Sequence, residues 1–436
     1  MTPVIRFLNS NRFRRLSKEG GWVVTGQVLV VLGSLALVRV LTEYLDPAEY
    51  GELALGLTVA ALVNQVLLGG IIAGVGRFYS IAAEKLELSS YLHATVCLLA
   101  YATAAVVAIA ILLMVGLFWL GYSQWMGLAA AALLFSLLSG YNTSLNGIQN
   151  AARQRHIVAL HGGMDAWLKI LLALWVMLWL GTTSTAVVLG YVLSSLAVTG
   201  SQFLFLRRTI LVKKEIQVAN ETPWQSRIWA YSWPFSTWGL FTWMHQVSDR
   251  WALQAYASIE DVGQYAVLFQ LGYTPIVLAT GMAMTFMGPI LYQRSGDASD
   301  QQRNTNVHRI SWWMTYLGLF FTMLGFVVTY VLHEWLFHFL VAPEYRDVSS
   351  LLPWVVLAGG IFASGQMLAL KLMSEMKSAK MVSAKIATAL LGIMFNVYGA
   401  SVAGPVGVVG ALVAFSIVYL VWMISLGFRV PTLNNP

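Results

Sequence analysis

Charged residues are scarce in this chain. Only 10% of its 436 residues are Asp, Glu, Lys or Arg, whereas 58% are hydrophobic, and the mean hydropathy is +0.69. Soluble globular domains carry roughly 25% charged residues. Windows of about 20 residues with at most one charge recur along the sequence, long enough to cross about 30 Å of hydrocarbon as helices. The composition therefore excludes a water-soluble fold and predicts an all-α polytopic membrane protein.

Cysteine and catalytic motifs are lacking too. The single cysteine, Cys97, lies in an apolar run, which excludes a disulfide framework and a multi-cysteine metal site. No GxxxxGK[ST], HExxH or GxSxG pattern occurs, so the chain has no motif for an ATPase, a metalloprotease or a serine hydrolase. The longest predicted loops, 207–227 and 333–350, are too short for a separate catalytic domain. We expect a protein that is not an enzyme and binds no metal or cofactor.

About twelve membrane-spanning segments can be placed from hydropathy, with boundaries accurate to a few residues. They are residues 22–43, 52–78, 91–120, 125–150, 157–180, 184–206, 228–256, 262–291, 310–332, 351–373, 379–400 and 406–428. Most of the 26 basic residues then fall on the side of the N-terminus, and the opposite loops hold only one, Arg346. This positive-inside asymmetry places both termini in the cytoplasm.

An internal repeat divides the chain. Aligning Gly51 on Gly263 places Glu49 on Asp261 and "YGELAL" beside "VGQYAV". Each stretch follows the first segment of a six-segment half, so the halves enter the membrane in the same sense, as in transporters built from parallel repeats. We expect two pseudo-symmetric six-helix lobes around a central cavity: 1–206 with a basic cytoplasmic N-terminus, and 228–436. Residues 207–227 are the basic cytoplasmic connector.

Several stretches resemble one known family. They are "GQVLVVLGSLALVRVLTEYLDPAEYGELALGLTVAALVNQVLLGGIIAGVGRFYS", "YSWPFS", "SDRWAL" and "EDVGQYAVLFQL". They resemble bacterial polysaccharide (Wzx-type, O-antigen) flippases of the multidrug/oligosaccharidyl-lipid/polysaccharide exporter superfamily. The resemblance implies export of an undecaprenyl-linked oligosaccharide across the bacterial cytoplasmic (inner) membrane, with H⁺ or Na⁺ as the coupling ion. It also implies membrane lipids and polysaccharide polymerase or co-polymerase machinery as partners, and no nucleic acid. Lipid II flippases of this superfamily carry fourteen spans, and this chain has about twelve.

Ionisable side chains inside the predicted spans need a reason, because each costs at least about 2.5–3.5 kcal/mol to insert near the bilayer centre. They are Arg39, Arg77, Asp165, Lys169, Asp249, Arg250, Lys371 and Lys385. Six cations against two acids give a net positive interior, which suits a diphosphate-linked, often acidic glycan.

The cations admit two interpretations. Arg39, Arg77 and Arg250 either bind substrate in a cationic lumen or, for Arg39 and Arg77, extend to the lipid headgroups. Arg39 falls one position out of register with Arg250 in the repeat. For Lys371 and Lys385, near the cytoplasmic ends of their spans, we expect extension to the headgroups.

Two acidic positions suggest different roles. Asp165 and Lys169 are four residues apart on one helical face, which predicts a structural ion pair, with a substrate contact from Lys169 as the alternative. Asp249 follows His245 by four residues, so the two together could bind a coupling ion. Alternatively, Asp249 only compensates the neighbouring positive charge.

Amides within the spans also admit two roles. Asn64 and Gln65, in the middle of the second span, are candidate contacts for sugar hydroxyls or interhelical hydrogen-bonding groups. Asn142, Asn146 and Asn150 recur every four residues and pose the same choice, with interhelical bonds favoured.

Three other functions compete with a glycan flippase. A MATE-like drug or metabolite exporter would share the fold, but an interior suited to cationic drugs conflicts with the intramembrane cations. An O-antigen ligase or polymerase would need a large outer loop with basic catalytic residues. A non-enzymatic assembly scaffold would not move substrate at all. The sequence does not name the glycan, its length, the coupling ion or the oligomeric state.

Overall fold

The computed structural model describes residues 11–208, 223–295, 301–374 and 378–428. Helices and turns make up all of this part, which contains no strand. Ten helices within it are long and apolar enough to cross a membrane, as expected for a multi-pass membrane protein. Much of the predicted 207–227 connector lies outside the described residues.

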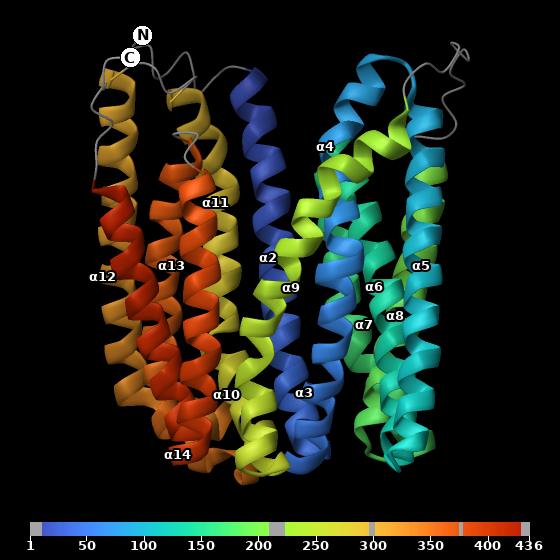
Figure 1. Cartoon of the computed structure of the whole chain (residues 1–436), viewed down its shortest axis with the longest axis vertical. Helices are drawn as coiled ribbons and strands as arrows, with labels where there is room; N and C mark the ends of the chain where they lie inside the picture. The colour runs from blue at the N-terminus through green and yellow to red at the C-terminus, as the bar shows by residue number, and fades with distance from the viewer. Residues whose placement is uncertain (1–10, 209–222, 296–300, 375–377, 429–436) are drawn as a thin grey trace. The chain divides into compact units, whose positions relative to one another are not determined.

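The first half of the chain forms a series of long helices (Figure 1). They are α2 (Asn11–Tyr44), α3 (Pro47–Leu62), the π-helix η1 (Val63–Leu68), α4 (Gly69–Glu84), α5 (Leu88–Trp119), the short 3₁₀ helix η2 (Ser123–Trp125), α6 (Met126–Ala151), α7 (Arg155–Leu180) and α8 (Ser184–Leu206). Gly181, at φ +87°, ends α7, and the Thr183 side chain accepts a hydrogen bond from the backbone N–H of Ala186 to begin α8.

The second half continues in the same way. Its elements are α9 (Trp224–Tyr256), α10 (Ile259–Gly272), α11 (Thr274–Ser295), α12 (Gln301–Leu340), the 3₁₀ helix η4 (Pro343–Leu351), α13 (Leu352–Ser374) and α14 (Ser378–Gly427). The backbone of α14 leaves helical geometry at Ala403 and at Gly404, whose φ of +52° favours glycine, directly before Pro405. This break separates the two expected segments 379–400 and 406–428. All twelve expected segments are therefore helical.

The helices group into two compact units. Unit 1 comprises Met1–Val40 and Leu55–Trp243, and unit 2 comprises Leu41–Ala54 and Met244–Pro436. The boundaries fall inside α2, α3 and α9, so these three helices each contribute to both units. The lobe boundaries expected from the repeat stay a prediction.

Unit 1 holds the first part of α9 against α3 and α4. The indole N–H of Trp243 donates to the carbonyl of Thr58 at 2.8 Å. The backbone of Gly70 lies against Ser232 and Ser236, so small residues allow the two helices to approach closely. A buried cluster joins α4, α5, α6 and α9 and includes Leu68, Val75, Tyr91, Leu98, Ile148, Trp224 and Ile228.

Unit 2 contains the turn between α2 and α3. The Asp46 carboxylate accepts a hydrogen bond from the backbone N–H of Glu49 at 2.8 Å and so caps the start of α3. Ser258 and Asp261 form a capping box at the start of α10. The acidic residues of both repeated turns thus lie at helix N-termini, where the helix dipole favours negative charge.

The aligned glycines of the repeat touch each other in unit 2. A Cβ added to Gly263 would lie 1.8 Å from the carbonyl oxygen of Pro47 and 3.0 Å from the backbone nitrogen of Gly51. A Cβ added to Gly51 would lie 2.1 Å from the carbonyl oxygen of Ile259. The starts of α3 and α10 therefore cross with their backbones in contact, which explains why glycine recurs at this position.

Tyr345 of η4 fixes the same turn. Its hydroxyl donates to the carbonyl of Leu45 at 2.8 Å, and its ring meets that of Tyr50 edge to face, with centroids 5.8 Å apart. The backbone N–H of Ala342 donates to the Thr42 hydroxyl at 3.4 Å. These bonds attach the α2–α3 turn to the rest of unit 2.

The expectation for Lys371 was wrong. Its side chain is fully buried in unit 2, and Nζ donates to the carbonyl of Gly427 at 2.7 Å. Gly427 is the last residue of α14, so the lysine satisfies a carbonyl that the helix itself leaves unbonded. The side chain of Lys385 lies outside the described residues.

Candidate functional site

Asp249 on α9 is the most buried acidic residue named from the sequence. It is 4% exposed, and its Oδ2 accepts a hydrogen bond from the hydroxyl of Tyr265 on α10 at 2.8 Å. Its Oδ1 accepts one from the backbone N–H of Arg250 at 2.7 Å. A buried carboxylate with two donors retains further lone pairs that can accept a proton or a cation.

Arg250 pairs with that carboxylate loosely. Its Nη1 lies 3.6 Å from Oδ1 of Asp249, beyond hydrogen-bonding distance. The guanidinium instead donates to the carbonyl of Gln246 at 3.3 Å and lies over the ring of Phe269, with 5.0 Å between its carbon and the ring centroid. Each of these contacts is weaker than a bidentate bond to a phosphate. An anionic group could thus displace them.

His245 lies on the same face of α9 but has different neighbours. Its ring packs on Phe415, with centroids 4.0 Å apart, and against the backbone of Gly392. The hydrogen bonds given above for Asp249 come from α10 and the backbone, not from this imidazole. Asp249 and His245 therefore share a helical face without a direct bond.

Two further polar residues of unit 2, Ser248 and Asn396, belong with this group, because Ser248 directly precedes Asp249 and bonds to Asn396. The side-chain amide of Asn396 on α14 donates to the Ser248 hydroxyl at 2.8 Å, and Asn396 is 4% exposed. Sequence reasoning missed Asn396, Ser248 and Tyr265. Asn396 could have been noticed as an amide within the apolar segment 379–400. Tyr265 lies in the quoted stretch "VGQYAV", but its pairing with Asp249 depends on the packing of α9 against α10. We call Asp249, Arg250, Tyr265, Ser248 and Asn396 the unit 2 polar layer.

In unit 1, Asp165 and Lys169 form an ion pair on α7. Nζ of Lys169 lies 2.6 Å from Oδ2 of Asp165. The ammonium also lies over two rings, 5.3 Å from the centroid of Phe135 and 5.9 Å from that of Tyr191. Ser194 of α8 donates to Oδ1 of Asp165 at 3.4 Å. The pair thus connects α7 to α6 and α8.

Asn64 and Gln65 lie in the π-helix η1. The amide of Asn64 donates to the Ser139 hydroxyl of α6 at 2.9 Å. The backbone carbonyl of Gln65 lies against Gly239 of α9. A π-helical turn inside a longer helix is rare and often occurs at functional sites. These two residues therefore combine an interhelical contact with an irregular backbone in the middle of a span.

The remaining cations of unit 1 differ in exposure. Arg39 is partly buried, whereas Arg77 on α4 is exposed. Arg39, Arg77, Lys169, Asn64 and Gln65 lie in unit 1, and Arg250, Asp249 and His245 lie in unit 2.

The amides of α6 bond between helices. Asn142 accepts a hydrogen bond from the Thr199 hydroxyl at 2.6 Å, Asn146 accepts one from the Gln202 amide at 2.9 Å, and Asn150 accepts one from Arg155 at 2.5 Å. The stripe therefore serves as interhelical contacts to α7 and α8.

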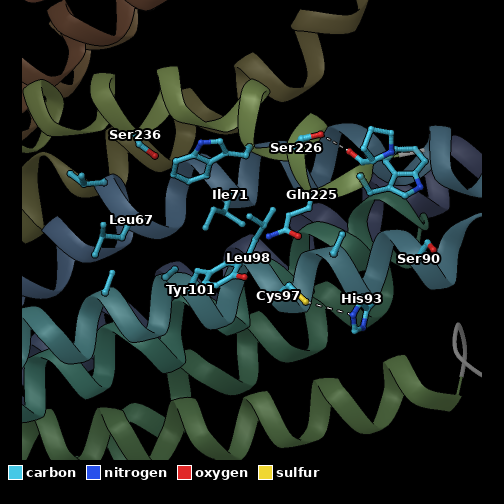
Figure 2. A pocket seen from close by; sticks show the side chains of 17 residues that line it. Leu67, Ile71, Ser90, His93, Cys97, Leu98, Tyr101, Gln225, Ser226 and Ser236 are labelled. Atoms are coloured by element: carbon cyan, nitrogen blue, oxygen red, sulfur yellow. Dashed lines mark hydrogen bonds between the residues drawn. The ribbon is translucent and has the colours of Figure 1, made fainter. Parts of the chain in front are cut away.

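A cavity of about 940 Å³ lies in unit 1, between η1 and α4, α5, and the start of α9 (Figure 2). His93, Cys97 and Tyr101 line it from α5 at four-residue spacing, and the Cys97 sulfur lies 3.7 Å from Nε2 of His93. Sequence reasoning read Cys97 only as an apolar residue. The cavity is separate from the residues predicted to bind substrate.

No protein-family model and no curated protein matches the chain. Several solved structures match the chain. The lipid II flippase MurJ, in an inward closed conformation, has a TM-score of 0.69 at 12% identity, over 95% of this chain and 88% of that chain. A multidrug resistance MATE family transporter of the MOP superfamily has a TM-score of 0.62 inward-facing, at 14% identity over 94% and 96% of the two chains. An outward-facing structure of a multidrug resistance MATE family transporter of the MOP superfamily has a TM-score of 0.61, at 15% identity over 98% of each chain.

The chain shares its fold with these structures. Identities of 12–15% establish this fold and nothing about substrate. This fold agrees with the expected all-α, multi-pass architecture.

Proposed function

We propose that the chain is a flippase that moves an undecaprenyl-linked oligosaccharide or related glycan across the bacterial cytoplasmic membrane, with both termini in the cytoplasm, for cell-surface polysaccharide biosynthesis. The observation that carries the proposal is the fold match to a lipid II flippase over 95% of this chain. The excess of cations inside the spans supports a substrate with a diphosphate or acidic head. Polysaccharide polymerase or co-polymerase machinery is the expected partner.

The unit 2 polar layer suggests how an ion could drive the cycle. In this proposal Asp249 binds H⁺ or Na⁺ in exchange for substrate. Arg250, whose Nη1 lies 3.6 Å from the Asp249 carboxylate, can bond a substrate phosphate bidentately. Because ion and substrate are bound in turn, ion exchange at Asp249 favours rocking to the outward-open state.

A reconstituted assay tests this function. The full chain is placed in proteoliposomes with an undecaprenyl-diphosphate-linked oligosaccharide, and an added glycosidase measures how much substrate reaches the outer leaflet. We expect flipping that responds to an imposed H⁺ or Na⁺ gradient and that weakens in Arg39→Ala, Arg77→Ala and Arg250→Ala. Arg207→Ala, an exposed arginine at the end of α8, is the control. Wild-type flipping in all three variants would exclude the cationic binding role.

A MATE-like exporter of drugs or metabolites is the second candidate, because MATE structures also match 94–98% of this chain. It predicts efflux of cationic antimicrobials and no flipping of the glycolipid. A deletion strain that becomes sensitive to such compounds while keeping its surface polysaccharide would favour the exporter.

A further inference from the structure

The cavity of unit 1 runs along α5 for about the thickness of one leaflet with its headgroups. Ser90 and Ala105 of α5 both line it, and fifteen residues of helix span about 22 Å. A bilayer is about 40–45 Å thick with its headgroup regions, so one leaflet supplies about half of that. The volume of about 940 Å³ is at the upper end of the usual range for ligand pockets. A long, narrow ligand fits these dimensions better than a compact metabolite.

The lining changes from polar to mostly apolar along this length. Ser90, His93 and Ser226 lie toward one end (Figure 2). Leu67, Ile71, Leu98, Ala102 and Ala105 line most of the rest, where Gln225, Tyr101 and Ser236 add polar groups. The polar end is at the start of α5 and of α9, which the charge distribution of the sequence assigns to the cytoplasmic side. A molecule with a polar head at the membrane surface and a hydrocarbon chain below it matches this gradient.

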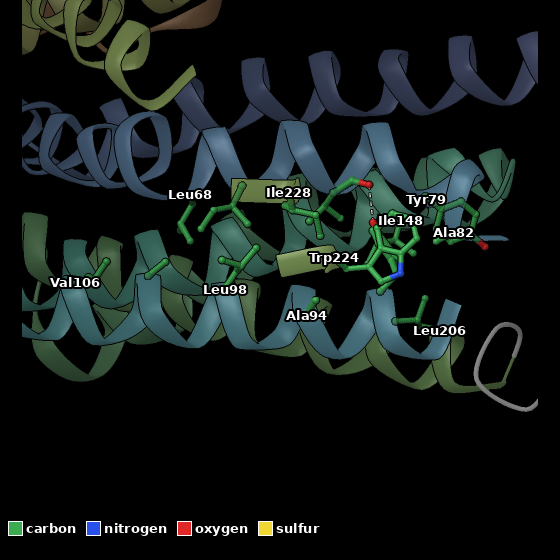
Figure 3. Packing of buried hydrophobic residues seen from close by; sticks show 14 of the residues in the cluster. Leu68, Tyr79, Ala82, Ala94, Leu98, Val106, Ile148, Leu206, Trp224 and Ile228 are labelled. Carbon is green, nitrogen blue, oxygen red and sulfur yellow. Dashed lines mark hydrogen bonds between the residues drawn. The ribbon is translucent and has the colours of Figure 1, made fainter. Parts of the chain in front are cut away.

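The walls of the cavity are held independently of any ligand. Leu98 and Trp224 belong to the buried cluster behind it (Figure 3), with 4% and 2% of their surfaces exposed. The Trp224 indole N–H donates to the Glu87 carboxylate at 2.8 Å, which fixes the start of α9 to the turn between α4 and α5. The cavity is therefore preformed, so a ligand need not displace core side chains.

Two cations lie near the polar end, beside the carboxylates of Glu84 and of Glu87, the latter bonded by Trp224. The guanidinium of Arg227 lies over the rings of Trp224 and Phe78, at 5.5 and 5.6 Å. Lys85 follows the last turn of α4 and is exposed. The cytoplasmic leaflet carries anionic lipids, which basic residues near the membrane surface attract.

We propose that this cavity binds one acyl chain of an anionic phospholipid of the cytoplasmic leaflet, with the phosphate head near Arg227 and the chain extending along α5 to Ala105. The bound lipid fills the space between α5 and α9 and so supports the first part of α9. This site is independent of the glycan-flipping proposal, because none of its residues is among those predicted to contact substrate.

Cys97 provides a direct test, because it is the only cysteine of the chain and lines the cavity. The full chain in detergent is alkylated with N-ethylmaleimide while dioleoylphosphatidylglycerol is titrated at constant detergent. We expect the alkylation rate to fall about tenfold once lipid exceeds its dissociation constant about tenfold. Dioleoylphosphatidylcholine should protect less. Cys97→Ser should give no labelling, which checks the specificity of the reagent.

Two matched variants locate the lipid. Ala105→Phe fills the deep end of the cavity, whereas Ala104→Phe adds the same ring at an exposed neighbour that does not line it. Protection should be lost in the first and kept in the second. Arg227→Ala should weaken protection by phosphatidylglycerol alone. This variant provides the test if Ala105→Phe does not fold.

Four results would overturn the proposal. No protection by either lipid excludes a lipid site. Equal protection by phosphatidylcholine, or undiminished protection in Ala105→Phe, excludes an anionic lipid chain in this position. Stronger protection by undecaprenyl phosphate assigns the cavity to the carrier lipid instead.

Discussion

The contact between Gly51 and Gly263 makes a quantitative prediction about stability. Real Cβ atoms keep about 3.0 Å from other heavy atoms, and a Cβ on Gly263 would meet the Pro47 carbonyl at 1.8 Å. Gly263→Ala must therefore move α3 and α10 apart by about 1.2 Å. Gly51→Ala meets a backbone oxygen in the same way, at 2.1 Å from Ile259. Neither obstacle is a flexible side chain, so the backbone itself has to yield.

The net cost combines two terms. Overpacking a tight contact costs about 1–3 kcal/mol, and alanine in place of glycine within a helix returns up to about 1 kcal/mol. We expect Gly51→Ala and Gly263→Ala each to destabilise the protein by about 1–2 kcal/mol. At about 2–4 °C per kcal/mol for 150–250 residues, Tm falls by about 2–8 °C. Intrinsic tryptophan fluorescence during heating, with the full chain in one detergent, measures this change.

Gly410→Ala is the matched control. Gly410 lies in α14 of the same unit, and a Cβ there would have no atom within 4 Å. Its substitution should leave Tm unchanged or raise it slightly. Wild-type Tm in both Gly51→Ala and Gly263→Ala would refute the close backbone approach. An equal loss in Gly410→Ala would mean that glycine acts through flexibility rather than through contact.

Four other substitutions test three polar contacts. Tyr265→Phe removes the hydroxyl that donates to Asp249, so we expect reduced flipping and a loss of about 1–3 kcal/mol, measured by the proteoliposome assay and by thermal unfolding. Asp165→Asn and Lys169→Met, alone and together, should show a coupling energy of about 0.5–3 kcal/mol in a double-mutant cycle of unfolding free energies. Asn142→Ala loses its bonds to α8 and should lower the unfolding temperature without a change in substrate preference.

Each of these has its own control. Tyr256→Phe alters an exposed tyrosine of the same unit and should change neither flipping nor stability. Thr143→Ala, at an exposed neighbour of Asn142 on α6, should change stability less. For the ion pair, the double variant separates the two roles of Lys169. If the double variant regains stability but not flipping, Lys169 contacts the substrate. If it regains both, the two residues form only a structural pair.

Hydropathy predicted the helices well because the membrane imposes one length and one composition on every span. It could not predict irregular backbone. The π-helix at Val63–Leu68 and the break at Ala403 and Gly404 depend on local packing and chain direction, which leave hydropathy unchanged. The position of an ionisable residue within a predicted span gives its depth in the membrane but not its bonding partner. Lys371 was therefore expected to extend to the headgroups, whereas its side chain bonds to the end of α14.

The candidate sites were predictable only where partners lie on one helix. The spacing of Asp165 and Lys169 gave their contact directly, since residues four apart share a helical face. Tyr265 and Asn396 reach the unit 2 polar layer from other helices, so no local spacing identifies them. The cavity of unit 1 is assembled from three separate stretches, 66–71, 90–105 and 223–236. Only the packed structure brings their side chains together.

The two repeated turns share the features that stabilise them but differ at a residue proposed to act in transport. Both turns keep a capped helix start and a glycine, because the backbones of α3 and α10 must touch there. The halves differ at the preceding cation. Arg250 follows an acidic residue, Asp249, whereas Arg39 follows Val38, a buried apolar residue. An arginine beside a buried carboxylate therefore occurs at only one of the two repeated positions. Under the proposed mechanism, this site binds one coupling ion per transport cycle, and the shared features of the turns serve stability rather than coupling.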